Sequence, residues 1–110
     1  MEKDFIIDQV SWHTNRLRNY EFDNSVIYKY FKSVIEYLQN NGLTTRMILA
    51  PTSEVKEETC IMAFDLTEDG MSLIKKAYGN WVDSVVDKKI ESNDYKILDR
   101  ALKKIRQSKT

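Results

Sequence analysis

The stretch that decides the fold is residues 23–42, DNSVIYKYFKSVIEYLQNNG. Its apolar residues are spaced alternately by one and three positions, which places them on a single stripe of an α-helix. Asp23 or Asn24 offers a side-chain oxygen as the N-cap, and Gly42 suits the left-handed residue that ends a helix, because it lacks a Cβ. The pattern therefore predicts a helix over residues 23–41. Its apolar stripe consists of Val26, Ile27, Tyr30, Phe31, Val34, Ile35 and Leu38.

Two segments nearer the C-terminus show helical periodicity as well. Residues 67–87 begin at Thr67, a good N-cap, and continue with Glu68 and Asp69 in the first turn, where the helix dipole favours negative charge. Gly79 falls inside this segment, where a glycine costs about 1 kcal/mol relative to alanine. We interpret it as a point of close helix packing; the alternative is a groove for a ligand. Residues 93–107 form the last predicted helix, capped by one of residues 92–94 (SND).

The remaining segments are less regular. Residues 5–13 alternate apolar and polar positions after Ile7, which predicts a short strand, and residues 14–22 have no clean period and are interpreted as a loop. Two short apolar runs, residues 45–50 and 59–65, flank Pro51 and could pair as a two-stranded ribbon. We therefore predict one domain over residues 1–110 that is mainly α. It has three main helices (23–41, 67–87 and 93–107), with an irregular or β-ribbon segment between the first two. The alternative is an α+β fold.

The composition excludes most familiar chemistry. The chain of 110 residues has one Cys, one His and three Gly, too few for a zinc site with nitrogen and sulfur ligands, an internal disulfide or a phosphate-binding glycine loop. We interpret Cys60 as a small buried hydrophobic residue. For His13 two interpretations stand equally: a surface or capping residue, or a functional one. No catalytic residue, metal ligand or cofactor is predicted, and an enzyme is not expected.

The 17 basic and 17 acidic residues cancel, but they are unevenly distributed. Residues 54–70 carry one basic against six acidic residues, and residues 96–110 carry six basic against one acidic residue. Either the two segments attract each other within the fold, or one of them faces a partner of opposite charge. Tyrosines at the flanks of the first helical stripe would add contact area at low entropic cost. The candidate partner-binding residues are Glu54, Glu57, Glu58, Glu68, Asp69, Tyr28 and Tyr37.

Five pieces of the sequence resemble small bacterial proteins found in toxin–immunity gene neighbourhoods. They are residues 11–15 (SWHTN), 38–46 (LQNNGLTTR), 65–70 (DLTEDG), 78–81 (YGNW) and the helical segment 97–105. The resemblance spans nearly the whole chain, and its motifs look like caps, helix stops and core aromatics. It implies a binding protein without catalytic activity, plausibly an immunity protein that sequesters a cognate toxin.

A DNA-binding regulator is the alternative function. Residues 64–70 (FDLTEDG), followed by an apolar helix, are similar to the end of the wing in some winged-helix regulators. Such folds require a basic recognition helix upstream, whereas the chain between Gly42 and Phe64 has only Arg46 and Lys56 as basic residues. Nucleic acid is therefore an unlikely partner. The N-terminus lacks the basic start and long apolar run of a signal peptide, and no membrane span is visible, so we expect a cytoplasmic protein.

Overall fold

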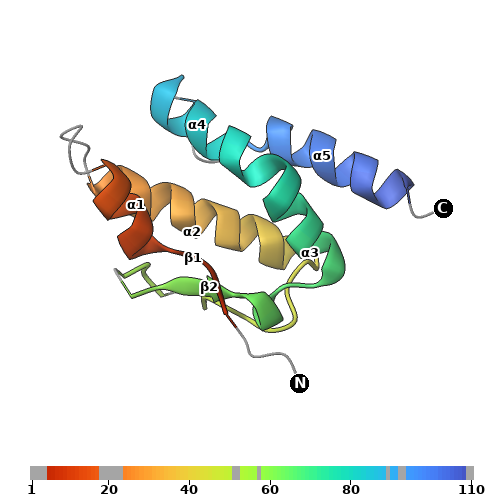
Figure 1. The fold of residues 1–110 in the computed structure, drawn as a ribbon, viewed down its shortest axis with the longest axis horizontal. Coiled ribbons are helices and arrows are strands. Elements are labelled where there is room, and N and C mark those ends of the chain that lie inside the picture. The colour runs from red at the N-terminus through yellow and green to blue at the C-terminus, as the bar shows by residue number, and fades with distance from the viewer. Residues whose placement is uncertain are drawn as a thin grey trace.

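The architecture is built around one long central helix. The computed structural model describes residues 5–17, 24–50, 53–56, 58–88, 90–91 and 94–108. Figure 1 shows α2 crossing the middle of the molecule, with α4 and α5 above it in this view and the strands below it. The order of elements is β1 (Ile6–Gln9), α1 (Val10–Leu17), α2 (Asn24–Asn40), β2 (Cys60–Met62), α3 (Glu68–Leu73), α4 (Gly79–Asp87) and α5 (Lys96–Gln107). The prediction of a mainly helical fold with three main helices is confirmed, and a two-stranded antiparallel sheet accompanies them.

The helix ends follow the predicted chemistry closely. Gly42 has a φ of 68°, in the left-handed region, and the Leu43 N–H donates to the Leu38 carbonyl at 2.9 Å to close the end of α2. The predicted cap Asp23 lies outside the described residues. α5 begins at Lys96 rather than at residue 93, and its N-cap is Tyr95, which forms no side-chain cap hydrogen bond, so the expected cap at Asp94 is wrong; Asp94 Oδ1, one residue earlier, accepts from the Lys96 N–H at 3.2 Å. Ser92 and Asn93 lie outside the described residues.

The second predicted helix is continuous but not uniform. Thr67 caps it as predicted, with Oγ1 accepting from the Gly70 N–H at 3.1 Å. Between α3 and α4 the chain makes a π-helical turn, Ile74–Tyr78. The expectation that Gly79 marks close packing is wrong, because a Cβ there would meet nothing within 4 Å. The close approach is instead at Gly70, where a Cβ would lie 2.4 Å from the Leu43 carbonyl oxygen.

The N-terminal strand is shorter than predicted, and a helix replaces the described part of the expected loop, residues 14–17. β1 ends at Gln9, and Val10 to Leu17 form α1, so Val10 and Trp12 are helical and residues 14–17 are not a loop. Residues 18–22 of the predicted loop lie outside the described residues. The helix wins because Val10 and His13, three positions apart, both become buried on one face of α1. The alternation after Ile7 indicated a strand, but from Val10 onward the chain follows the helical period instead.

The predicted ribbon has the wrong partner. β2 pairs with β1, in the register Ile6–Met62, Asp8–Ile61 and Gln9–Cys60 with an irregularity at Ile7, rather than with residues 45–50. An isolated antiparallel bridge joins Thr44 and Leu66, which lie just outside the two segments that were expected to pair. The segment around residue 45 lies beside the 3₁₀ turn Ala63–Asp65, where the Thr45 N–H donates to the Asp65 carbonyl at 2.8 Å. A turn cannot continue a ladder, so no ribbon forms there.

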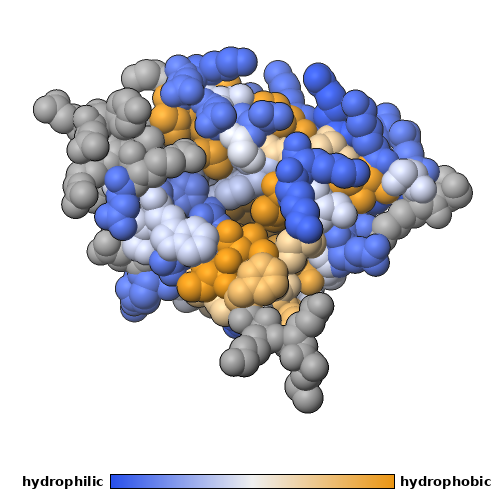
Figure 2. Space-filling view, in the orientation of Figure 1, coloured by the Kyte–Doolittle hydropathy of each residue, from blue (hydrophilic) through white to orange (hydrophobic). Residues whose placement is uncertain are grey.

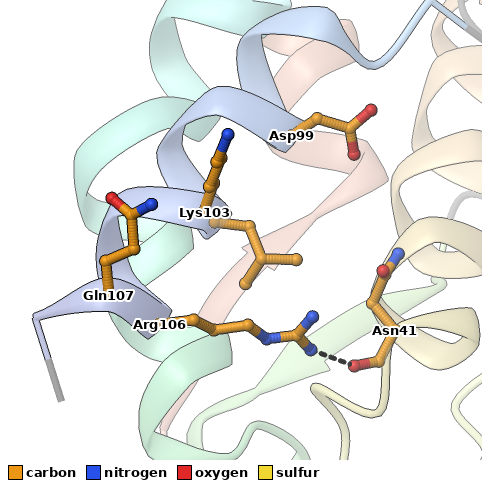
Figure 3. A pocket seen from close by; sticks show the side chains of 6 residues that line it. Asn41, Asp99, Lys103, Arg106 and Gln107 are labelled. Atoms are coloured by element: carbon orange, nitrogen blue, oxygen red, sulfur yellow. Dashed lines mark hydrogen bonds between the residues drawn. The ribbon is translucent and has the colours of Figure 1, made fainter. Parts of the chain in front are cut away.

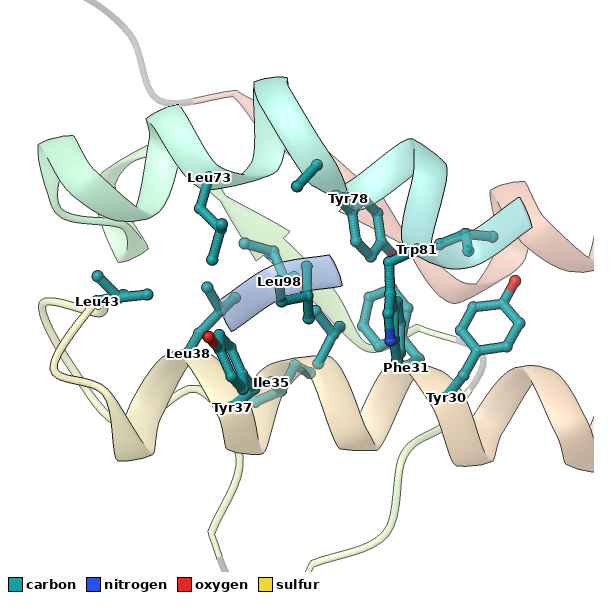
Figure 4. Packing of buried hydrophobic residues seen from close by; sticks show 14 of the residues in the cluster. Tyr30, Phe31, Ile35, Tyr37, Leu38, Leu43, Leu73, Tyr78, Trp81 and Leu98 are labelled. Carbon is teal, nitrogen blue, oxygen red and sulfur yellow. The ribbon is translucent and has the colours of Figure 1, made fainter. Parts of the chain in front are cut away.

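The core lies between α2 and the later helices. Figure 4 shows Tyr30, Phe31 and Leu38 of α2 facing Leu73, Trp81 and Leu98 from the helices that cover it. All of these side chains are almost fully buried, as is Ile61 from β2. The predicted stripe of α2 is buried throughout, apart from Val26, which is partly buried. Burial of this stripe is the main stabilising term for the fold.

Candidate functional site

The two tyrosines proposed as partner anchors differ in exposure. Tyr28 is partly buried and remains available at the surface. Tyr37 is only 4 % exposed, and its hydroxyl donates to Asp99 Oδ1 on α5 at 2.6 Å. Burial, and then the hydrogen bond to the Asp99 carboxylate, raise the pKa of Tyr37 well above its ordinary value. Tyr37 therefore joins α2 to α5, and its expected exposure is wrong.

The acidic candidates differ in their exposure. Glu54, Glu58 and Glu68 are exposed and Asp69 is partly buried, whereas Glu57 lies outside the described residues. Along the chain, Glu54 and Glu58 precede β2, and Glu68 is the first residue of α3, after the 3₁₀ turn. Glu54 lies 3.7 Å from Lys32 Nζ on α2. Glu58 and Glu68 therefore remain as exposed carboxylates without a basic partner among the described residues, whereas Glu54 lies beside a lysine.

One further acidic residue of this segment is structural. Asp65 is buried and forms an ion pair with the Arg46 guanidinium, whose Nη2 lies 3.1 Å from Asp65 Oδ2. Oδ2 also accepts from the Met62 N–H at 3.0 Å. This pair holds the loop after α2 against the end of β2, so Asp65 offers no charge to a partner.

A buried polar cluster joins four side chains from four different elements, which no local sequence pattern groups. His13 Nε2 lies 2.6 Å from Asp8 Oδ2, and His13 Nδ1 lies 2.6 Å from the Tyr30 hydroxyl. The Tyr78 hydroxyl donates to the same Asp8 oxygen at 2.6 Å. Each of these four residues is at most 8 % exposed. The only sequence signal for the cluster was the three-residue spacing of Val10 and His13, which places His13 on the buried face of α1.

Two arrangements of the protons satisfy every hydrogen bond around His13. With neutral His13, the Tyr30 hydroxyl donates to Nδ1 and the Nε2–H donates to Asp8; with protonated His13, both ring nitrogens donate. In either case the His13 imidazole is fixed from both sides. A carboxylate, an imidazole and a phenol in line resemble a proton relay, but all of them are buried, so we interpret the cluster as structural.

Cys60 does not extend this cluster into a nucleophile–base pair. Its thiol lies 3.8 Å from Met62 Sδ, and both ring nitrogens of His13 already face other partners. Cys60 is partly exposed, so its interpretation as a buried residue is wrong. Among the residues that the structure places, no group of three or more His, Cys, Asp or Glu side chains could hold a metal ion.

Large hydrophobic side chains are exposed near the sheet. Phe5 and Phe64 are 57 % and 58 % exposed, and Ile6 is 37 % exposed. The Ala63 N–H donates to the Phe5 carbonyl at 2.8 Å, which sets Phe5 beside the turn that carries Phe64. Figure 2 shows hydrophobic side chains gathered over the two strands. We call Phe5, Ile6 and Phe64 the apolar surface; Trp12 and Met47 are further exposed hydrophobic residues.

Helix α5 borders two hollows. The first, of about 420 Å³, lies between α5 and the end of α2, where Arg106 Nη2 donates to the Asn41 carbonyl at 2.8 Å (Figure 3). Asp99 and Lys103 stand on its wall, so its charge is mixed. The second hollow, of about 290 Å³, lies between α5 and the π-helical turn, and its charged side chains are all basic. Sequence reasoning identified the basic segment but not its division between two hollows.

Comparisons of the chain with models of protein families, with curated proteins and with solved structures find no match. Among the described residues, no helix is both long and apolar enough to cross a membrane.

Proposed function

We propose that the chain is a protein-binding module without catalytic activity, and that its partner contacts the apolar surface. The observation that carries this proposal is the exposure of Phe5 and Ile6 at the start of β1 and of Phe64 in the 3₁₀ turn that follows β2. Large exposed hydrophobic groups cost solubility, and in proteins they gather where another molecule covers them. Aromatic side chains also dominate the free energy of binding at such contacts.

The finer proposal is a cytoplasmic immunity protein that sequesters a cognate toxin. It is supported by the resemblance in residues 11–15, 38–46, 65–70 and 78–81. Sequestration requires only a surface that covers the toxin, so an interface of aromatic anchors and flanking charges suffices. Glu58 and Glu68, which remain exposed, are the flanking carboxylates available to a basic partner.

The test is co-expression with the product of the neighbouring gene, followed by purification of the complex and measurement of its affinity. The paired change Phe5→Ser and Phe64→Ser is expected to weaken binding by about thirtyfold, because buried aromatic anchors contribute about 2 kcal/mol or more. Lys88→Ser, beyond the end of α4, is the control and should leave the affinity unchanged. Both variants should keep the melting temperature of the unaltered protein.

The outcomes separate the possibilities. If reversing Glu57 and Glu58 to lysine weakens binding while the apolar variant does not, the acidic segment is the interface and the apolar surface is not. If no toxin domain is encoded nearby and the neighbouring product does not bind, the immunity proposal fails.

A DNA-binding regulator is the second candidate, favoured by the basic side chains of α5. Its affinity should fall steeply with salt, because each phosphate contact releases a counterion. Truncation after Asp99 would remove Leu102 and Ile105 from the core, so neutralising Arg100 and Lys104 to glutamine is the cleaner test. The absence of a mobility shift with duplex DNA at low salt would eliminate this candidate.

A further inference from the structure

The smaller hollow beside α5 combines exposed cations with an apolar floor. It lies between the helix that runs from the π-helical turn into α4 and the first three turns of α5, and it measures about 290 Å³. Its lining consists of Lys76, Ala77, Asn80, Ile97, Arg100, Ala101 and Lys104. We call it the basic groove. Three of its residues are cationic and none is acidic, so it would hold an anion more readily than a neutral group.

The cations of the basic groove have no counterion in the described part of the chain. Lys76, Arg100 and Lys104 are exposed, and none of them forms an ion pair with a carboxylate of the described residues. Arg100 lies four residues before Lys104 and four after Lys96, so the three share one face of α5. Like charges at this spacing destabilise a helix. A bound anion would remove that repulsion.

The floor of the basic groove is apolar. Ala77 is buried, and Ile97 and Ala101 are partly buried, so a ligand would find small hydrophobic contacts between the charged walls. Figure 2 shows hydrophilic side chains standing along α5 with hydrophobic atoms between them. Ala77 belongs to the π-helical turn, a rare conformation that is frequent at functional sites. The turn is therefore a second feature, independent of charge, at the same place.

We propose that the basic groove binds an acidic segment of a protein partner that also carries an apolar side chain; the protein nature of this occupant rests on the proposed function. Carboxylates would meet Lys76, Arg100 and Lys104, and the apolar side chain would cover Ile97. A nucleic-acid backbone would satisfy the cations but would set polar sugar and phosphate against the apolar floor. The zero net charge of the chain also disfavours a nucleic-acid ligand.

The test is an NMR titration of the full chain with three probes. The first is a short peptide of alternating glutamate and leucine, the second is the same peptide with serine in place of leucine, and the third is duplex DNA. We expect the glutamate–leucine peptide to shift the signals of Ala77, Ile97 and Ala101, and to bind at least about threefold more tightly than the serine peptide, because only leucine fills the apolar floor. Neither Phe5 nor Phe64 is expected to respond.

Adjacent lysines supply the matched control. Lys75 and Lys76 are both exposed and follow each other in the π-helical turn, but only Lys76 lines the groove. The triple change Lys76→Gln, Arg100→Gln and Lys104→Gln is expected to weaken the peptide by about tenfold, the sum of three surface ion pairs. Lys75→Gln should leave its affinity unchanged. The melting temperature of the triple variant should not fall, since the change relieves repulsion.

Three results would overturn the proposal: no shift at millimolar peptide, equal binding by the triple variant, or tighter binding of duplex DNA at the same signals. The last would assign the groove to nucleic acid. Because this test uses no cellular partner and reads signals away from the apolar surface, its failure leaves the proposed function standing. Failure of the neighbouring gene product to bind leaves the groove testable in turn.

Discussion

At the scale of single residues, the strongest constraint in the molecule is the buried cluster around His13. Asp8, His13, Tyr30 and Tyr78 come from β1, α1, α2 and the π-helical turn, so each hydrogen bond in the cluster ties two elements together. A buried carboxylate is costly unless its oxygens accept hydrogen bonds. Asp8 meets this condition, with Oδ2 facing His13 and Tyr78 and Oδ1 accepting from the Gln9 N–H at 3.0 Å.

Removing the Tyr78 hydroxyl should show how much this cluster stabilises the fold. Tyr78→Phe keeps the ring but leaves the buried Asp8 carboxylate with one donor fewer, so we expect a loss of about 1.5–3 kcal/mol in the free energy of unfolding. Urea denaturation followed by tryptophan fluorescence measures it. Tyr28→Phe is the control, because the Tyr28 hydroxyl bonds to no described residue, and it should change stability by less than about 0.5 kcal/mol. Equal effects of the two substitutions would show that the cluster contributes nothing.

At the scale of elements, the two glycines of the long α3–α4 helix differ: one is required by close packing and the other is not. Gly70 faces the Leu43 carbonyl, which also accepts from the Thr67 N–H at 2.9 Å and from Thr67 Oγ1 at 3.1 Å. The chain after α2 thus packs directly on the first turn of α3. Gly79 has an ordinary helical φ of −59° and open space around it, so nothing in the described structure requires a glycine there.

Alanine at these two positions should therefore shift stability in opposite directions. Gly79→Ala is expected to stabilise the protein by about 1 kcal/mol, the difference in helix propensity. Gly70→Ala is expected to destabilise it by about 1–3 kcal/mol, because a backbone oxygen at 2.4 Å must move. Thermal melts of both variants measure the effects. Destabilisation by Gly79→Ala would mean that the π-helical turn depends on the glycine beside it.

The long helices could be predicted from the sequence because their signals are local. The stripe of α2, the cap at Thr67 and the stop at Gly42 are each contained within a few residues. β1 and α1 share one short stretch in which both periods fit, and only packing against α2 decides between them. Two contacts join distant parts of the chain: Ile6 pairs with Met62, and Asp8 accepts a hydrogen bond from Tyr78. No local sequence pattern predicts either of them.

The candidate site was predictable only in part, for the same reason. The basic character of residues 96–110 is visible in the sequence, but the groove exists because Lys76 on another helix faces Arg100 and Lys104. Tyr37 at the flank of the α2 stripe looked exposed because the sequence does not show that α5 covers it. The apolar surface could not be predicted because Phe5 and Phe64 are 59 positions apart, and their chain segments come together only through β1–β2 pairing and the hydrogen bond from the Ala63 N–H to the Phe5 carbonyl.

At the scale of the whole molecule, α5 is held on α2 by hydrophobic packing and by hydrogen bonds from two tyrosines. The Tyr37 hydroxyl donates to Asp99, and the Tyr95 hydroxyl donates to the Ser33 carbonyl at 3.0 Å. The two rings also lie against each other, with centroids 4.7 Å apart. Burial is the main cause that raises the pKa of both tyrosines. Packing of the basic helix on the rest of the fold is therefore sensitive to high pH.

The free energy of unfolding should fall as the pH rises above about 10, because an unfolded tyrosine loses its proton there while folded Tyr37 keeps its own. The stabilisation linked to the raised pKa is thus fully present below about pH 10 and is lost as the pH rises toward the pKa of the folded state. Tyr37→Phe removes this titration, together with the hydrogen bond to Asp99. The variant should be less stable than the unaltered protein by about 1–3 kcal/mol near neutral pH, and the gap should narrow as the pH rises. Urea denaturation of both proteins across this range measures the gap; a constant difference would show that Tyr37 ionises alike in the folded and unfolded chain.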